Sequence, residues 1–95
     1  MNAPLDLRLL PRTATVDDAG RLAIDGVDLE ALAREHGTPL YVYSETELRA
    51  RATEYRDAFG PDAVSYAGKA FLCGAMARLA AEEGLHLDVA TGGEL

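Results

Sequence analysis

The sequence predicts an α/β fold in which parallel strands alternate with helices. From residue 41 onward the order is strand, helix, strand, helix, strand, and both helices are about three turns long, which is typical of successive βα units. The composition, 48% hydrophobic and 26% charged, is that of ordinary globular protein. Since a closed barrel of such units needs about 250 residues, we expect these 95 residues to begin a larger α/β fold.

The first 37 residues carry signals for a β-hairpin and a short helix. Residues that favour strands at 13–16 and 21–24 flank an Asp-Asp-Ala-Gly turn, which predicts two antiparallel strands. Asp28 stands before apolar residues at helical spacing, and a glycine follows them. We therefore expect Asp28 to cap a helix over residues 29–36.

The segment after residue 37 begins with a strand and the most distinct helix of the chain. Residues 40–43 read Leu-Tyr-Val-Tyr and are expected to form a strand. Ser44, with Glu47 three residues later, makes a capping box that starts a helix. Apolar side chains then recur along one face of this helix until a Gly-Pro pair stops it: Leu48, Ala52, Tyr55 and Phe59.

Two further strands with a helix between them complete the alternation. Residues 64–69 predict a strand, an apolar stripe over residues 72–80 predicts a helix that ends at Gly84, and residues 85–90 predict the next strand. We expect these two strands to be adjacent and parallel, joined by a right-handed helical crossover.

Lys69 is the first candidate for chemistry. It is the single lysine beside eight arginines, and it stands at the predicted carboxyl end of a strand, where parallel α/β folds gather their reactive groups. In an apolar setting a lysine amine gives up its proton more readily and can attack an aldehyde, whereas a guanidinium cannot. The alternative is a structural lysine whose stem is buried and whose ammonium reaches solvent.

Asp88 is the carboxylate that we expect nearest to Lys69. Alternation along the strands places Ala67 and Lys69 on one face, and His86 and Asp88 on the same interior face of the neighbouring strand. A carboxylate there could hold a protonated amine or accept a hydrogen bond from a cofactor bound to it. A purely structural ion pair between Lys69 and Asp88 explains the spacing equally well.

Other features carry weaker signals. Gly92 and Gly93 could present backbone N–H groups to a phosphate, but two glycines more often only make a turn. Cys73 lacks a base partner and is expected as a small buried side chain. His86 is expected as a hydrogen-bonded interior histidine. The single cysteine and two histidines form no ligand cluster, so we expect no metal site.

Charge and hydropathy exclude several classes of protein. The net charge is -7 and the arginines are scattered, which argues against binding to nucleic acid. No apolar run approaches the roughly 20 residues of a membrane span, and the first ten residues do not resemble a leader. One cysteine excludes an internal disulfide and fits a reducing compartment. We therefore expect a cytoplasmic protein that binds neither nucleic acid nor membrane.

The sequence resembles the start of the fold-type III pyridoxal-phosphate-dependent decarboxylases, the family that acts on ornithine, arginine and diaminopimelate. The resemblance is carried by Tyr-Ala-Gly-Lys-Ala at 66–70 and Leu-Asp-Val-Ala-Thr-Gly-Gly-Glu-Leu at 87–95, with Gly-Thr-Pro-Leu-Tyr-Val-Tyr at 37–43. It covers nearly the whole chain from Leu29 and is closest to the actinobacterial branch that acts on meso-diaminopimelate. Ala-Phe-Leu-Cys at 70–73 departs from the commoner Ala-Asn-Pro pattern.

This resemblance implies a fold, a cofactor and a reaction. Residues 38–95 would begin a (β/α)8 barrel of the alanine-racemase-like type that binds pyridoxal 5'-phosphate, and residues 1–37 would contribute to a separate β domain. Lys69 would bind the cofactor covalently, with Ala67 and Asp88 beside it. The implied reaction is the decarboxylation of meso-diaminopimelate to L-lysine and carbon dioxide, a step of lysine biosynthesis, by a homodimer.

Other functions stay open on the sequence alone. A different decarboxylase of the family, an amino-acid racemase or a pyridoxal-phosphate carrier would share Lys69. A small non-catalytic interaction module is a further alternative, supported only by the acidic composition and the short chain. In the catalytic cases the phosphate-binding and substrate-binding groups would follow residue 95. The 95-residue chain alone is then expected to be an inactive N-terminal fragment.

Overall fold

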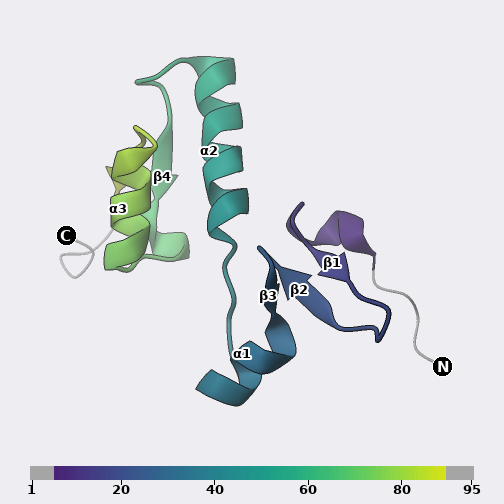
Figure 1. The fold of residues 1–95 in the computed structure, drawn as a ribbon. Coiled ribbons are helices and arrows are strands. Elements are labelled where there is room, and N and C mark those ends of the chain that lie inside the picture. The colour runs from purple at the N-terminus through teal and green to yellow at the C-terminus, as the bar shows by residue number, and fades with distance from the viewer. Residues whose placement is uncertain (1–5, 90–95) are drawn as a thin grey trace. The chain divides into compact units, whose positions relative to one another are not determined.

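A computed structural model describes residues 6–89 of the chain (Figure 1). Contacts within the chain divide it into an N-terminal unit, Met1–Leu48, and a C-terminal unit, Arg49–Leu95. The division falls inside the longest helix, α2 (Glu45–Phe59). The first turn of α2 therefore belongs to the N-terminal unit, and the remaining turns belong to the C-terminal unit.

The N-terminal unit is built on a three-stranded antiparallel sheet in the order β1-β2-β3. Strands β1 (Thr15–Val16) and β2 (Leu22–Ile24) form the predicted hairpin. A third strand, β3 (Val27–Asp28), pairs with β2 and was not predicted. Asp25 and Gly26 connect these two strands with φ values of 53° and 77°, as a two-residue hairpin turn of type I′ requires. The Asp-Gly pair is the sequence signal that would have identified β3.

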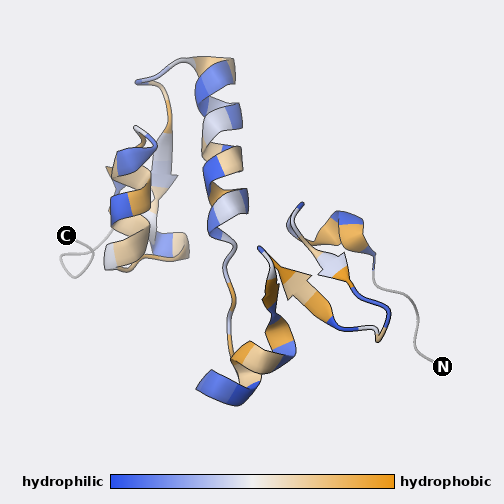
Figure 2. Ribbon diagram, in the orientation of Figure 1, coloured by the Kyte–Doolittle hydropathy of each residue, from blue (hydrophilic) through white to orange (hydrophobic). Residues whose placement is uncertain are grey.

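Helix α1 (Leu29–His36) follows β3 directly and has the bounds expected from the sequence. The carboxylate of Asp28 accepts a hydrogen bond of 2.9 Å from the backbone N–H of Glu30, one of the amides that the helix itself leaves unpaired. The helix contacts β2 and β3, and Figure 2 shows β2 in the colour of hydrophobic residues. A 3₁₀ helix, η1 (Leu7–Leu9), precedes this sheet in the chain.

The strand expected at residues 40–43 is wrong. These residues connect α1 to α2 without regular secondary structure. A strand needs a partner for its backbone N–H and C=O groups, and neither sheet in the described part of the chain includes this segment. Its side chains are exposed, Tyr41 by 87%. Propensity for β structure alone was therefore a poor guide here.

Ser44 caps α2 and joins it to the turn between β2 and β3. This side chain is buried, accepts a hydrogen bond of 3.0 Å from the N–H of Glu47, and donates one of 2.7 Å to the carboxylate of Asp25. The same carboxylate accepts hydrogen bonds from the Thr13 hydroxyl and from the N–H of Thr46. These bonds, above all those from Thr13 and then Ser44, lower the pKa of Asp25. The predicted cap is confirmed, with Asp25 as its unforeseen partner.

The C-terminal unit contains the predicted βαβ arrangement. Strand β4 (Ser65–Ala67) pairs in parallel with β5 (His86–Asp88), and α3 (Gly74–Glu82) lies between them in the chain (Figure 1). The expected parallel pairing is confirmed. Both strands are shorter than predicted, and the chain turns into a 3₁₀ helix, η2 (Gly68–Ala70), directly after β4. The buried side chains of this unit come from α2 and α3: Ala52, Met76, Leu79 and Ala80.

Gly84 ends α3 in a backbone conformation that favours glycine. Its φ is 75°, its N–H donates to the carbonyl of Ala81, and the N–H of Leu85 donates to the carbonyl of Ala80 at 2.9 Å. These two bonds make a Schellman motif, which satisfies carbonyls that the last turn leaves unpaired. Any other residue at position 84 would need the same left-handed backbone conformation, and its Cβ would lie 3.6 Å from the guanidinium of Arg56.

The Asp25 carboxylate should make the start of α2 sensitive to acid. Because its pKa is lowered in the folded state, its stabilisation is present above the unfolded value of about 3.9 and is lost as the pH falls through the folded value. We expect protection of the Thr46 and Glu47 amides from hydrogen exchange to fall below about pH 4. Asp25→Asn should weaken this protection and remove most of its pH dependence, whereas Asp17→Asn should not. An unchanged pH dependence in Asp25→Asn would contradict this role.

Alanine should have opposite effects at two glycines of the C-terminal unit. Gly84→Ala should lower the free energy of unfolding by about 1–2 kcal/mol, because a non-glycine residue is strained at positive φ. Gly74→Ala should raise it by up to about 1 kcal/mol, since Gly74 starts α3 with nothing within 4 Å of an added Cβ. Thermal unfolding followed by circular dichroism gives both values. Equal effects at the two sites would refute the argument.

Candidate functional site

Lys69 lies in η2, immediately after the carboxyl end of β4. The strand expected over residues 64–69 is therefore wrong at its end, because β4 stops at Ala67. The Lys69 side chain is exposed, and no described residue forms an ion pair or hydrogen bond with its ammonium. The residue thus stands where parallel strands usually present reactive groups, but on a short turn rather than in the strand.

Asp88 lies on the neighbouring strand at the same edge of the sheet. Ala67 and Asp88 are partners in the register of the parallel pair, as are Ser65 and His86. Residues two apart on a strand share a face, so all four side chains lie on one face of the sheet. All four are exposed. The structure therefore confirms that one face of this sheet carries small and polar side chains, with a carboxylate at its carboxyl edge.

The structural ion pair between Lys69 and Asp88 is not formed. Within residues 6–89 neither side chain has an ion-pair partner. The two-residue alternation that placed Lys69 on the Asp88 face does not extend through η2, because a 3₁₀ helix has three residues per turn. What remains is an amine directly after β4 and a carboxylate at the end of β5, both exposed and each without an ion-pair partner among the described residues.

A hydrogen bond across the loop restrains the residues around Lys69. The hydroxyl of Tyr66 donates to the backbone carbonyl of Phe71, and both residues are half-buried. The bond joins the two ends of the segment that contains Ala67, η2 and Lys69. Sequence reasoning missed this contact. The signal was a tyrosine in an apolar strand, since a tyrosine hydroxyl removed from solvent usually has a hydrogen-bond partner.

Three weaker candidates differ from expectation or lie outside the description. Cys73 is exposed, so its expected burial is wrong; α3 begins at Gly74, which makes Cys73 the N-cap. His86 is exposed rather than interior in this structure. Gly92 and Gly93 lie outside the described residues. Between residues 6 and 89 no group of three or more His, Cys, Asp or Glu side chains could hold a metal ion, and no helix has the length and apolar character to cross a bilayer.

The arrangement offers two complementary groups at one edge of a sheet. A lysine amine that has lost its proton can form a covalent bond with a carbonyl carbon. A carboxylate on the next strand can accept hydrogen bonds from an ammonium or from a bound ring nitrogen. Ala67, with the smallest side chain that carries a Cβ, leaves the face beside them open. These features fit a carbonyl-bearing cofactor.

Comparison with curated sequences identifies relatives of this chain that share one name. No family model matches the chain. It is 54% identical over 86 residues to the diaminopimelate decarboxylase of Mycobacterium tuberculosis strain H37Rv, which covers 90% of this chain and 19% of that protein. It is 46% identical over 92 residues to the diaminopimelate decarboxylase of Synechocystis, which covers 92% of this chain and 20% of that protein.

Solved structures give the same result. The crystal structure of diaminopimelate decarboxylase from M. jannaschii has a TM-score of 0.79 and 39% identity, covering 88% of this chain and 21% of that one. A second structure of that enzyme, in co-complex with L-lysine, has a TM-score of 0.68 and 37% identity. The chain spans about one fifth of the length of the curated relatives that it matches. In sequence and in structure it is therefore similar to a part of the diaminopimelate decarboxylases.

Proposed function

We propose that this chain is the N-terminal, lysine-bearing part of a diaminopimelate decarboxylase. The full enzyme would convert meso-2,6-diaminopimelate to L-lysine and carbon dioxide with pyridoxal 5'-phosphate. The observation that carries the proposal is 54% identity over 90% of the chain to an enzyme of that name, in a segment that includes a lysine beside a parallel strand. The relatives named above are all decarboxylases of diaminopimelate, which favours this function over a racemase or a carrier protein.

Three residues would hold the cofactor. Lys69 would bind its carbonyl carbon, since the amine is exposed and has no described partner that would hold it elsewhere. Asp88 would accept a hydrogen bond from the cofactor or from the Lys69 ammonium at the carboxyl edge of the sheet. Ala67 would lie beneath the cofactor, where its methyl group leaves room for a flat ring. The cofactor itself would accept the electron pair that remains when carbon dioxide leaves the substrate.

We further propose the architecture and setting that such an enzyme implies. The parallel β4–α3–β5 arrangement supports residues 38–95 as the beginning of a (β/α)8 barrel. The antiparallel strands β1, β2 and β3 support residues 1–37 as part of a separate β domain. The co-complex of the M. jannaschii enzyme with L-lysine supports an amino-acid ligand. A cytoplasmic homodimer is the expected form of the whole protein.

A chimera tests the role of Lys69. In this chimera, the chain replaces the matching segment of the M. tuberculosis relative, and the relative supplies the rest of the enzyme. We expect meso-diaminopimelate to be decarboxylated, and borohydride reduction followed by peptide mapping to find pyridoxal phosphate fixed on Lys69. Lys69→Arg should abolish both results, because a guanidinium keeps the charge but is a poor nucleophile. The 95-residue chain alone should show no turnover above free cofactor. Cofactor fixed on another lysine would contradict the proposal.

The same chimera tests Tyr66 as a positioning residue. Tyr66→Phe removes only the hydroxyl that donates to the carbonyl of Phe71, so the loop that carries Lys69 loses one restraint. A neutral hydrogen bond contributes roughly 1 kcal/mol, and we expect kcat to fall by about five-fold with little change in KM. The cofactor should still be fixed on Lys69. Tyr41→Phe, at a tyrosine that is 87% exposed in the connection between α1 and α2, is the matched control and should leave kcat unchanged. Equal kinetics for both variants would remove Tyr66 from this role.

A further inference from the structure

Helix α2 is covered on one flank within the C-terminal unit. Ala52 is 6% exposed, and Arg49, one turn earlier, pairs with Glu82 and Glu83 near the end of α3 at 3.1 and 2.8 Å. One turn after Ala52, the guanidinium of Arg56 lies close to the turn that follows α3. The C-terminal end of α3 therefore lies against this flank of α2.

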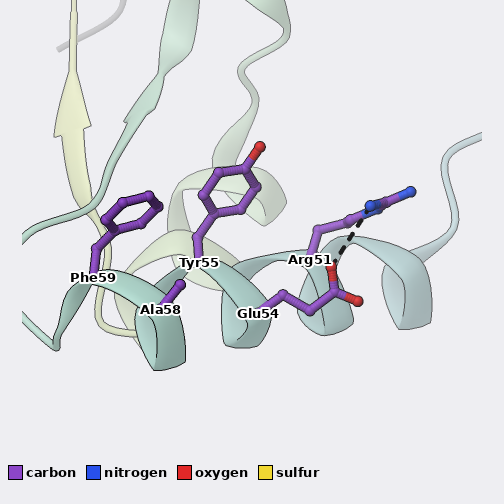
Figure 3. Close-up of a pocket in the computed structure, with 5 residues that line it drawn as sticks. All are labelled: Arg51, Glu54, Tyr55, Ala58 and Phe59. Carbon is purple, nitrogen blue, oxygen red and sulfur yellow. Dashed lines mark ion pairs between the residues drawn. The ribbon is translucent and has the colours of Figure 1, made fainter.

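The neighbouring flank of α2 is apolar and uncovered. Tyr55 and Phe59 were predicted on the same face as Ala52, yet their exposed fractions are 56% and 67%. Their ring centroids lie 6.3 Å apart and the rings are nearly parallel. Figure 3 shows both rings projecting from the same side of the helix. Two large side chains of this kind, side by side and in solvent, are typical of an interface that has lost its partner.

A shallow hollow lies beside the two rings. It has a volume of about 170 Å³ and is lined by residues of α2 alone: Arg51, Glu54, Tyr55, Ala58 and Phe59. Ala58 lies between the two rings in the sequence, and an ion pair of 3.6 Å between Arg51 and Glu54 lies toward the start of the helix (Figure 3). The flank thus has an aromatic centre, a small residue that admits a neighbouring side chain, and a charged rim, as protein interfaces do.

We propose that this Tyr55–Phe59 flank is the docking surface for an amphipathic helix from the part of the decarboxylase outside this chain. The inference rests on the proposed function. The matched relatives are about five times as long as the matched segment, so they contain polypeptide that can supply such a helix. In a ring of helices around a barrel each helix has a neighbour on both flanks, and α3 occupies only one flank of α2. The apolar side of the partner helix would fill the hollow beside Ala58.

Two serine substitutions in two settings test the docking surface. Phe59→Ser and Tyr55→Ser are introduced into the isolated 95-residue chain and into the chimera with the M. tuberculosis relative. In the isolated chain the rings are exposed, so amide protection along α2 should not fall. In the chimera the rings would be buried against the partner helix. Each serine would therefore remove a buried contact, and the melting temperature should fall by several degrees. Asp57→Ser, at an exposed position of the same helix, should change neither protein.

A labelling experiment covers the case in which a serine chimera does not fold. Phe59→Cys, in a Cys73→Ser background, should react with a thiol reagent at least about ten-fold more slowly in the chimera than in the isolated chain. Equal labelling rates, or serine variants that melt at the parent temperature in an active chimera, would overturn the docking surface and leave the proposed function standing. If Phe59→Ser lowers the melting temperature of the chimera but pyridoxal phosphate is never fixed on Lys69, the docking surface would stand and the proposed function would be contradicted.

A second copy of this chain is the competing occupant. If it covered the flank, sedimentation of the isolated chain would reveal a dimer, and Phe59→Ser would dissociate that dimer. This result would overturn the proposal of a helix from the same enzyme. A monomer over the same concentrations, together with slow labelling in the chimera, is the outcome that we expect.

Discussion

The parallel pairing of β4 with β5 is the constraint on which the candidate site depends. Parallel strands end at the same edge of a sheet, so the residue that closes β5, Asp88, and the turn that follows β4 are brought together although about 20 positions separate them. Helix α3 provides the connection that parallel strands need, and its C-terminal end lies against α2 through the ion pairs of Arg49. Without this register the amine and the carboxylate would be unrelated surface groups.

A second constraint acts at the start of α2 and is made of short polar side chains. Ser44 is the only buried polar side chain of the described residues, and its hydroxyl is used in both directions, as acceptor from Glu47 and as donor to Asp25. A buried hydroxyl is costly when unpaired, so these bonds hold the helix start against the hairpin turn. The carboxylate of Glu47 adds a bond of 2.7 Å to Arg12. Local polar chemistry, rather than a large core, organises this unit.

Sequence patterns correctly predicted elements whose signals lie within a few residues. They failed for elements that depend on contacts with distant parts of the chain. Helix α1 has the expected bounds, because its cap at Asp28 and its terminal glycine are set within a few residues. The expected strand at residues 40–43 had the right residues but no partner among the described strands. Cys73 is exposed at the N-cap of α3, which begins two positions after the start of the predicted stripe. The parallel pair was predictable from alternation. The end of β4 before Lys69 was not, since nothing in the side-chain pattern of residues 64–69 signals η2.

Lys69 and the rings of Tyr55 and Phe59 are all exposed, and in the proposed enzyme further polypeptide would cover them. The described residues leave the side chain of Lys69 exposed. The Tyr55–Phe59 flank lacks cover in the same way. Since fixed position and excluded water supply much of the rate enhancement of enzymes, we expect the polypeptide proposed to cover these surfaces to increase the reactivity of the lysine as well.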